Sequence, residues 1–115
     1  MSAIKLNIRI PFNGDTALGP GKVDLLEAIV TTGSISAAAK SMHMSYKRAW
    51  DLVNMMNISF KQPLVITATG GKHGGGAQVS DFGLNVIQIY RQMERQALEA
   101  IDTTSIKLMS ELKQE

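Results

Sequence analysis

Two short helical segments separated by only about three residues are the feature that most restricts how this chain can fold. The first segment, about Ser36 to Met42, is rich in alanine, whose small side chain permits a neighbouring helix to approach closely. The second begins after Ser45, a residue type that caps helix N-termini, and runs to about Ser59 with polar and basic residues in its first turn. Two short helices on so tight a turn are typical of a helix-turn-helix, which we predict over about residues 36–59.

A β-hairpin is predicted directly after these helices. Residues Pro63 to Thr69 are rich in β-branched side chains, Ala77 to Ser80 form a second short strand, and five glycines lie between them. Another helix, about Lys22 to Thr32, precedes the pair and stops at Gly33. Three helices followed by a hairpin form a winged helix, so the expected fold class is α+β, mostly α, with the wing at about residues 64–80.

The residues before the first helix alternate between apolar and polar. Ile4 to Ile10 are therefore predicted to form one half-buried strand. Pro11 and the Asn-Gly-Asp cluster at residues 13–15 should end it with a turn, after which Thr16 to Leu18 can pair back as a short second strand. We expect the first strand to complete the small sheet of the wing.

The last third of the chain is predicted to be one long amphipathic helix that begins at Asp81. Its apolar stripe consists of Val86, Tyr90, Met93, Ala97, Ile101 and Leu108. Unbroken to Lys113, the helix would be roughly 50 Å long, and a monomer of 115 residues cannot cover both its sides, so the stripe predicts pairing with a second chain. The alternative is a break at Asp102 to Ser105. The expected organisation is thus a winged helix-turn-helix DNA-binding domain over residues 1–80 and a dimerisation helix over 81–115.

Composition excludes several classes of protein. The 115 residues have the length of one domain, and the absence of cysteine excludes disulfides and thiolate metal sites. No signal peptide opens the chain and no apolar run approaches the roughly 20 residues of a membrane span, so we expect a soluble cytoplasmic protein without a membrane partner. Five basic residues and one acid lie between Lys40 and Ser80, which indicates either a local anionic partner or an ordinary solvated face.

The glycine-rich segment does not match a nucleotide-binding loop. Gly71-Lys72 is followed by His73 and then a strand, whereas a P-loop needs a Ser or Thr after the lysine and a helix behind it. The two histidines, His43 and His73, have no carboxylate pair beside them, so neither a metal site nor acid–base catalysis is predicted. We therefore expect no enzyme activity and no cofactor, and interpret His43 as a turn residue with an unusual backbone conformation.

Polar and basic side chains gather in the first turn of the helix after Ser45, the place from which side chains enter the major groove in a helix-turn-helix. Arg48 can pair with guanine and Asn54 with adenine, while Trp50 is interpreted as a packing residue in preference to a base-stacking one. The residues expected to face the major groove are Ser45, Tyr46, Lys47, Arg48, Asp51 and Asn54. Those expected to contact the phosphate backbone from the preceding helix are Ser34, Ser36 and Lys40.

Four motifs in this sequence resemble those of a known family. They are Gly-Ser-Ile-Ser from Gly33, Ser-Tyr-Lys-Arg-Ala-Trp-Asp from Ser45, Met-Asn at residues 56–57, and Thr-Gly-Gly-Lys-His-Gly-Gly-Gly-Ala from Thr69. Between about residues 4 and 98 the chain resembles the N-terminal DNA-binding domain of the molybdate-dependent transcriptional regulators, the ModE type. A weaker likeness extends to the LysR-type helix-turn-helix.

The resemblance implies a winged-helix homodimer that binds an inverted-repeat operator in double-stranded DNA and regulates molybdenum-related genes. The wing residues that it implies to contact DNA are Thr69, Gly70, Gly71, Lys72, His73, Gly74, Gly75 and Gly76. His43 stands where the family often has glycine, and no molybdate-binding domain is recognised before Glu115. The rival hypothesis is an interaction module whose long helix pairs with a separate effector-binding subunit, with little DNA binding of its own.

Overall fold

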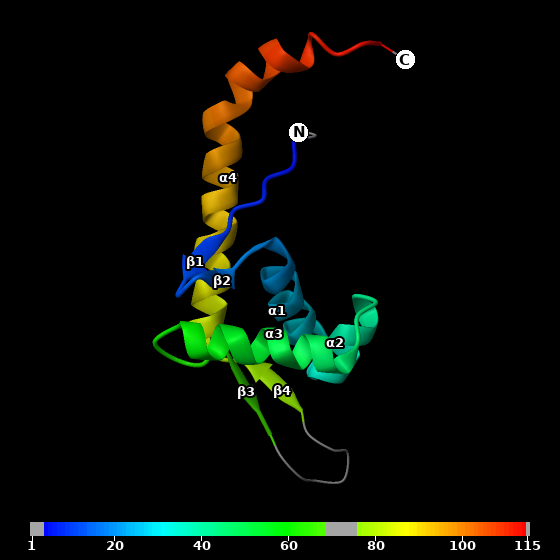
Figure 1. The fold of residues 1–115 in the computed structure, drawn as a ribbon, viewed down its shortest axis with the longest axis vertical. Coiled ribbons are helices and arrows are strands. Elements are labelled where there is room, and N and C mark those ends of the chain that lie inside the picture. The colour runs from blue at the N-terminus through cyan, green and yellow to red at the C-terminus, as the bar shows by residue number, and fades with distance from the viewer. Residues whose placement is uncertain (1–3, 69–75, 115) are drawn as a thin grey trace.

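The computed structural model of the chain describes residues 4–68 and 76–114. Its elements follow the predicted order, in which three short helices, a hairpin and a long helix come after a small N-terminal hairpin (Figure 1). In chain order they are β1 (Ile10–Phe12), β2 (Asp15–Leu18), α1 (Pro20–Thr32), α2 (Ile35–Ser41), α3 (Tyr46–Ser59), β3 (Val65–Thr67), β4 (Ala77–Val79) and α4 (Asp81–Met109). The winged helix-turn-helix is thereby confirmed, with α4 projecting from it.

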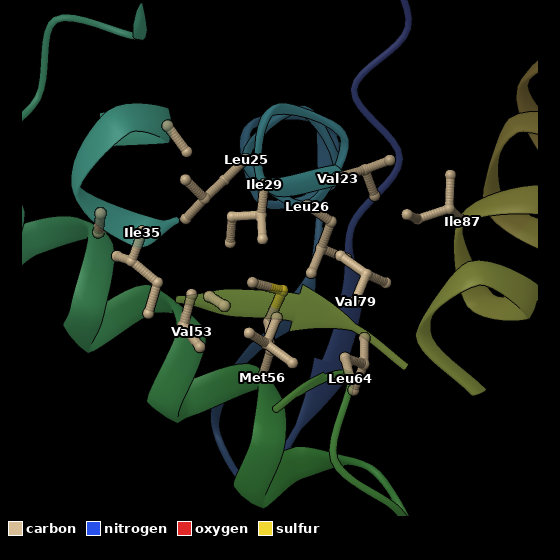
Figure 2. Close-up of a cluster of buried hydrophobic side chains, with 14 of the residues drawn as sticks. Val23, Leu25, Leu26, Ile29, Ile35, Val53, Met56, Leu64, Val79 and Ile87 are labelled. Carbon is tan, nitrogen blue, oxygen red and sulfur yellow. The ribbon is translucent and has the colours of Figure 1, made fainter. Parts of the chain in front are cut away.

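The core forms around α1, which is apolar on several sides (Figure 2). Figure 2 shows Leu25 of α1 on the side of Ile35 in α2, and Val23 of α1 on the side of Ile87 in α4. Met56 of α3 is fully buried in the same cluster. Burying one such side chain is worth about 1.5–3 kcal/mol. Since α1 packs against α3, β4 and α4, it is the element to which all three are attached.

The backbone turns of the helix-turn-helix match the residue types found there. Gly33 takes the left-handed conformation, with φ of 76°, and donates its N–H to the carbonyl of Ile29 at 2.8 Å, which ends α1 as predicted. His43 is also left-handed, with φ of 56°, and this confirms its interpretation as a turn residue. The turn between α2 and α3 therefore keeps the geometry that glycine would adopt most easily.

The predicted N-terminal strand is largely wrong. Strand β1 contains only Ile10–Phe12, and Pro11, which was expected to end the strand, lies inside it at an irregularity in the pairing. Residues 4–9 still alternate between half-buried and exposed, because they run alongside α4 (Figure 1). The carbonyl of Ile8 accepts a hydrogen bond at 2.7 Å from the hydroxyl of Tyr90 in α4. Alternation thus identified the buried side correctly, but the element that covers it is a helix.

The chain reverses after β1 as predicted. Asn13 and Gly14 both have positive φ, 50° and 78°, which is the two-residue hairpin turn that Asn-Gly favours, and β2 pairs back antiparallel. The β1–β2 and β3–β4 hairpins are nevertheless separate two-stranded sheets. The expectation that the first strand completes the sheet of the wing is therefore wrong, because the N-terminal stretch is bound to α4 instead.

Helix α4 is continuous from Asp81 to Met109, so the alternative of a break at Asp102 to Ser105 is wrong. The hydroxyl of Ser105 donates to the carbonyl of Asp102 at 2.8 Å, so this polar side chain is satisfied within the helix and does not open it. The 29 residues extend about 43 Å at ~1.5 Å per residue, which is most of the 57 Å long axis of the molecule.

Arg91 ties α4 to α1. Its guanidinium lies 2.7 Å from the carboxylate of Asp24 and 2.6 Å from that of Glu27, both on α1, and 2.9 Å from Glu94 on its own helix. These carboxylates raise the pKa of Arg91 above its usual range, and the hydrogen bonds to Glu27 are the largest cause. Because α1 also packs against α3, this cluster couples the direction of α4 to the position of α3.

Candidate nucleic-acid interface

The first turn of α3 is exposed and carries the predicted base-reading residues. Ser45 caps the helix as predicted, since its hydroxyl oxygen accepts a hydrogen bond at 3.1 Å from the backbone N–H of Arg48. Ala49, Val53 and Met56 hold the opposite side of α3 in the core. The residues left exposed on the outside are Ser45, Tyr46, Lys47, Arg48, Asp51 and Asn54. All six predicted side chains are therefore accessible.

Lys47 and Asp51 form an ion pair on this surface. Their charged atoms lie 2.8 Å apart, one helical turn from each other, and both side chains are more than half exposed. Such a pair contributes little to stability. It does reduce the positive charge that Lys47 presents. Arg48 is then the cation of the first turn that forms no ion pair with any of the described residues.

The residues predicted at the start of α2 divide between two roles. The hydroxyl of Ser34 accepts from the backbone N–H of Ala37 at 2.9 Å, so Ser34 rather than Ser36 is the cap. A serine hydroxyl that accepts at a cap still has its own proton to donate. Ser36 is exposed at the N-terminal end, whereas Lys40 is exposed in the last turn of α2 and not at its start.

A cleft of about 360 Å³ beside Arg48 contains groups that sequence reasoning missed. Asp15, the first residue of β2, and Lys22, in the first turn of α1, line it. The ammonium group of Lys22 donates to the carbonyl of Thr16, and burial lowers the pKa of Lys22, an effect that the nearby Asp15 opposes. A neighbouring cleft adds Arg9. No spacing in the sequence relates these residues to Arg48, because only the tertiary fold brings them together.

The wing begins as an antiparallel pair in which Val65 lies opposite Val79. The pairing continues one step beyond the strands, where Ala68 donates to the carbonyl of Gly76 at 2.9 Å. Of the wing residues predicted to contact DNA, Gly76 is the one that the structure describes. The other predicted residues, Thr69, Gly70, Gly71, Lys72, His73, Gly74 and Gly75, lie outside the described residues.

Asn57 of α3 attaches the wing to this helix. Its side-chain oxygen accepts from the backbone N–H of Leu64 at 2.9 Å and of Val65 at 3.1 Å, and its amide group donates to the carbonyl of Val65 at 3.0 Å. From the sequence, Asn57 was only part of a motif, because its partners are seven and eight residues away across a loop. These three bonds hold the start of β3 at a set position relative to α3.

Trp50 does not pack into the core, although packing was the favoured interpretation. Its side chain is 44% exposed, and Tyr46, one turn earlier, is 56% exposed. Among the described residues, neither ring contacts another ring or takes part in a hydrogen bond. Two large aromatic side chains thus lie on the outside of α3.

The residues predicted for dimerisation fall into two groups. Val86 and Tyr90 are buried within the chain's own core, so the expectation that they face a second chain is corrected: the N-terminal stretch and α1 already cover them. Met93 and Ile101 are each 37% exposed, Leu108 is 74% exposed, and Ala97 is half-buried. The apolar surface left for a partner therefore begins near Met93.

An apolar groove of about 210 Å³ adjoins this surface and was not anticipated from the sequence. Its lining comprises Ile10, Leu18, Phe60, Val86, Ile89, Tyr90 and Met93. Within residues 4–68 and 76–114, no helix is long and apolar enough to cross a bilayer. Over the same residues, no group of three His, Asp or Glu side chains is placed to hold a metal ion.

The fold and the exposed end of α3 define a winged helix-turn-helix domain of the kind that binds DNA. Residues 21–83 match the profile described as "Bacterial regulatory helix-turn-helix protein, lysR family". The chain belongs to this family.

Among individual proteins, the chain is similar to molybdenum-related regulators. It is 40% identical over 110 residues to "Molybdenum transport protein ModE" of Azotobacter vinelandii, covering 94% of this chain and 41% of that protein. It is 43% identical over 86 residues to "DNA-binding transcriptional dual regulator ModE" of Escherichia coli K12, covering 75% of this chain and 33% of that protein. These matches confirm the resemblance seen in the motifs, while the chain spans less than half the length of either relative.

Solved structures agree on the fold. Full-length LysG of Corynebacterium glutamicum, a structure with bound arginine effector, superposes with a TM-score of 0.55 at 21% identity, covering 79% of this chain and 29% of that one. A MarR family protein of Bacillus stearothermophilus gives a TM-score of 0.55 at 15% identity, covering 81% of this chain and 68% of that one. At these identities the likeness supports the winged-helix architecture alone.

Proposed function

We propose that this chain binds an inverted-repeat operator in double-stranded DNA as a homodimer and regulates transcription of molybdenum-related genes in the cytoplasm. The observation that carries the proposal is the exposed first turn of α3, where Tyr46, Lys47 and Arg48 lie outside the core. The names of its relatives, which include transcriptional regulators of the ModE type, support the same function.

In this proposal the exposed residues of α3 read the major groove. Arg48 pairs with guanine and Asn54 with adenine, since these pairings match hydrogen-bonding edges. Ser34, Ser36 and Lys40 contact the phosphate backbone from α2, and the wing residues from Thr69 to Gly76 contact the backbone or minor groove. Lys22 and Arg9 extend the positive surface on the other side of α3.

Dimerisation places two copies of α3 in successive major grooves, about 34 Å apart on one face of the duplex. The exposed apolar surface of α4 beyond Met93 supports pairing with a second copy. An inverted repeat in the DNA follows from the two-fold symmetry of such a pair.

A gel-shift titration against promoter fragments of molybdenum-related genes, at low and high salt and with and without molybdate, tests the proposal. We expect a shift that weakens steeply as salt increases and that does not depend on molybdate. The control is the same titration with Lys107→Ala, which removes one exposed charge from the last turn of α4. A molybdate-dependent shift would instead place an oxyanion sensor within these 115 residues.

The second candidate is an interaction module that pairs with a separate effector-binding subunit. It is favoured by the apolar side chains near the C-terminal end of α4, where Ile106 and Leu108 are exposed. Absence of a shift on any fragment at low salt would favour this module over the DNA-binding regulator.

A further inference from the structure

The outside of α3 has two sides that differ in chemistry. One side, with Arg48, Leu52 and Met55, lines the cleft shared with Lys22. At 100° per residue, Tyr46, Trp50 and Asn57 fall within about 40° of one another on the other side. Asn57 is hydrogen-bonded to β3, so this second side of α3 is the one that faces the wing.

Tyr46 and Trp50, hereafter the aromatic pair, have no partner that explains their position. They are one helical turn apart and therefore adjacent on the surface. Both are about half exposed, and neither is among the side chains that pack against the core. An exposed apolar patch rimmed by polar residues can mark an interaction site, and this adjacent pair of aromatic side chains lies next to Lys47 and Arg48 in the sequence.

We propose that the aromatic pair contacts the 5-methyl groups of thymines in the major groove, and that Trp50 is a specificity-determining residue of this interface. This inference rests on the proposed DNA binding and deepens it. A double-stranded DNA is the partner that fits, because cationic side chains flank the pair and the first two turns of α3 are its location. The thymine methyl is the one apolar group that a base edge displays in the major groove.

The inference predicts that different residues of α3 make the hydrogen-bonding and the apolar contacts to the bases. Arg48 and Asn54 recognise hydrogen-bonding edges, whereas Trp50, on the wing side, selects A·T pairs by apolar contact. The half-site should therefore contain a thymine beside the base pairs that Arg48 reads. A change of thymine to deoxyuridine removes only the methyl group and keeps every hydrogen-bonding atom.

The experiment begins with selection of binding duplexes from a random pool by the wild-type chain. The dissociation constant is then measured for the selected duplex and for the same duplex with deoxyuridine in place of thymine in the half-sites. We expect the wild type to bind the deoxyuridine duplex about three- to fivefold more weakly for each contacted methyl group. Trp50→Ala should bind both duplexes equally, and Trp50→Phe should keep part of the difference.

Ile58→Ala is the matched control, since Ile58 is an exposed apolar residue of α3 two turns beyond Trp50 and off the wing side. This variant should retain the full preference for thymine. Circular dichroism melting establishes that each variant is folded.

Fluorescence gives a second measurement, because Trp50 is the only tryptophan of the chain. Quenching of its emission by acrylamide should fall by about half or more when the selected duplex is bound. The inference is overturned if the wild type binds the thymine and deoxyuridine duplexes equally, if Trp50→Ala retains the preference, or if quenching is unchanged on binding. Selection of no sequence at all would overturn the proposed function itself.

Discussion

Gly83, the third residue of α4, lies against the carbonyl group of Leu64 and the side chain of Val79. A Cβ at this position would overlap both. The hydroxyl of Ser80 meanwhile accepts from the N–H of Gly83 at 2.9 Å, which fixes the start of the helix. The close approach lets the first turn of α4 pack directly on the base of the wing, so a residue type that costs helix stability elsewhere is required here.

Gly83→Ala should therefore lower the free energy of unfolding by about 1–3 kcal/mol, since backbone and Val79 have to shift to admit the methyl group. The measurement is urea unfolding followed by circular dichroism. Gly21→Ala in α1 is the control, because a Cβ there meets nothing within 4 Å, and it should be neutral or stabilising by up to about 1 kcal/mol. Equal stability of wild type and Gly83→Ala would show that this junction is loosely packed.

Arg48 and Lys72 should differ in what their loss does to DNA binding. Arg48→Ala is expected to change sequence preference at one position by roughly 1–3 kcal/mol, as for a bidentate base contact. Lys72→Ala is expected to weaken binding to all sequences alike and to reduce the salt slope by about one counterion. Competition titrations with single-base operator variants, repeated at several salt concentrations, separate the two effects. If Arg48→Ala weakens binding to all sequences equally, Arg48 contacts phosphate and not a base. If Lys72→Ala leaves the salt dependence of binding unchanged, Lys72 does not contact the DNA backbone.

At the scale of the elements, local signals predicted the helices and turns well, and long-range partners were not predictable. Caps at Ser45 and the stops at Gly33 and His43 act within four residues, so residue type alone indicates them. The prediction of a strand over residues 4–10 was wrong because the alternation of apolar and polar residues is the same whether a strand or a helix covers the apolar side. The bonds of Arg91 to α1 span more than 60 residues, and no periodicity encodes such a pairing.

Tyr90 is the residue through which α4 holds the N-terminal stretch. Its side chain is 1% exposed, and its hydroxyl donates to the carbonyl of Ile8. Burial foremost, with Glu94 second, raises the pKa of Tyr90 above 10.0. A phenol whose pKa is higher in the folded state stabilises the fold while it is protonated, below its unfolded pKa near 10, and loses this contribution as the pH rises through the folded pKa.

Tyr90→Phe should consequently be about 1–2 kcal/mol less stable than the wild type at pH 7, because the carbonyl of Ile8 loses its donor. The difference should shrink above pH 10, where the unfolded wild-type chain loses the phenol proton before the folded chain does. Urea unfolding between pH 7 and 11 measures both effects. Tyr46→Phe, which alters an exposed tyrosine, should match the wild type throughout. A constant difference across this pH range would contradict the assigned role of the Tyr90 proton.

The molecule is more elongated than a compact domain of its length. Its radius of gyration is 17.0 Å, whereas about 13 Å is typical of a compact domain of this length. The excess comes from the distal half of α4, whose apolar side chains stay exposed at Ile101, Ile106 and Leu108. An isolated helical segment of this kind is marginal in water, and these exposed side chains are the apolar surface on which the proposed pairing with a second copy rests.

If α4 joins two copies as proposed, Met93→Lys and Ile101→Lys should each shift the dimer toward monomers of 12.5 kDa, because each would place a charge in the apolar surface between the copies. We expect each change to weaken dimerisation by about 2 kcal/mol, or roughly thirtyfold. Sedimentation velocity over a range of concentrations measures this. Amide exchange over residues 101–109 should accelerate in parallel, since the distal turns would lose their cover. Ile58→Lys, which charges an exposed apolar position on α3, should leave the mass unchanged. If the wild type sediments as a monomer at every concentration, or if both α4 variants remain dimeric, then α4 does not join two copies. The two-fold symmetry from which the inverted-repeat operator was inferred would then have no support.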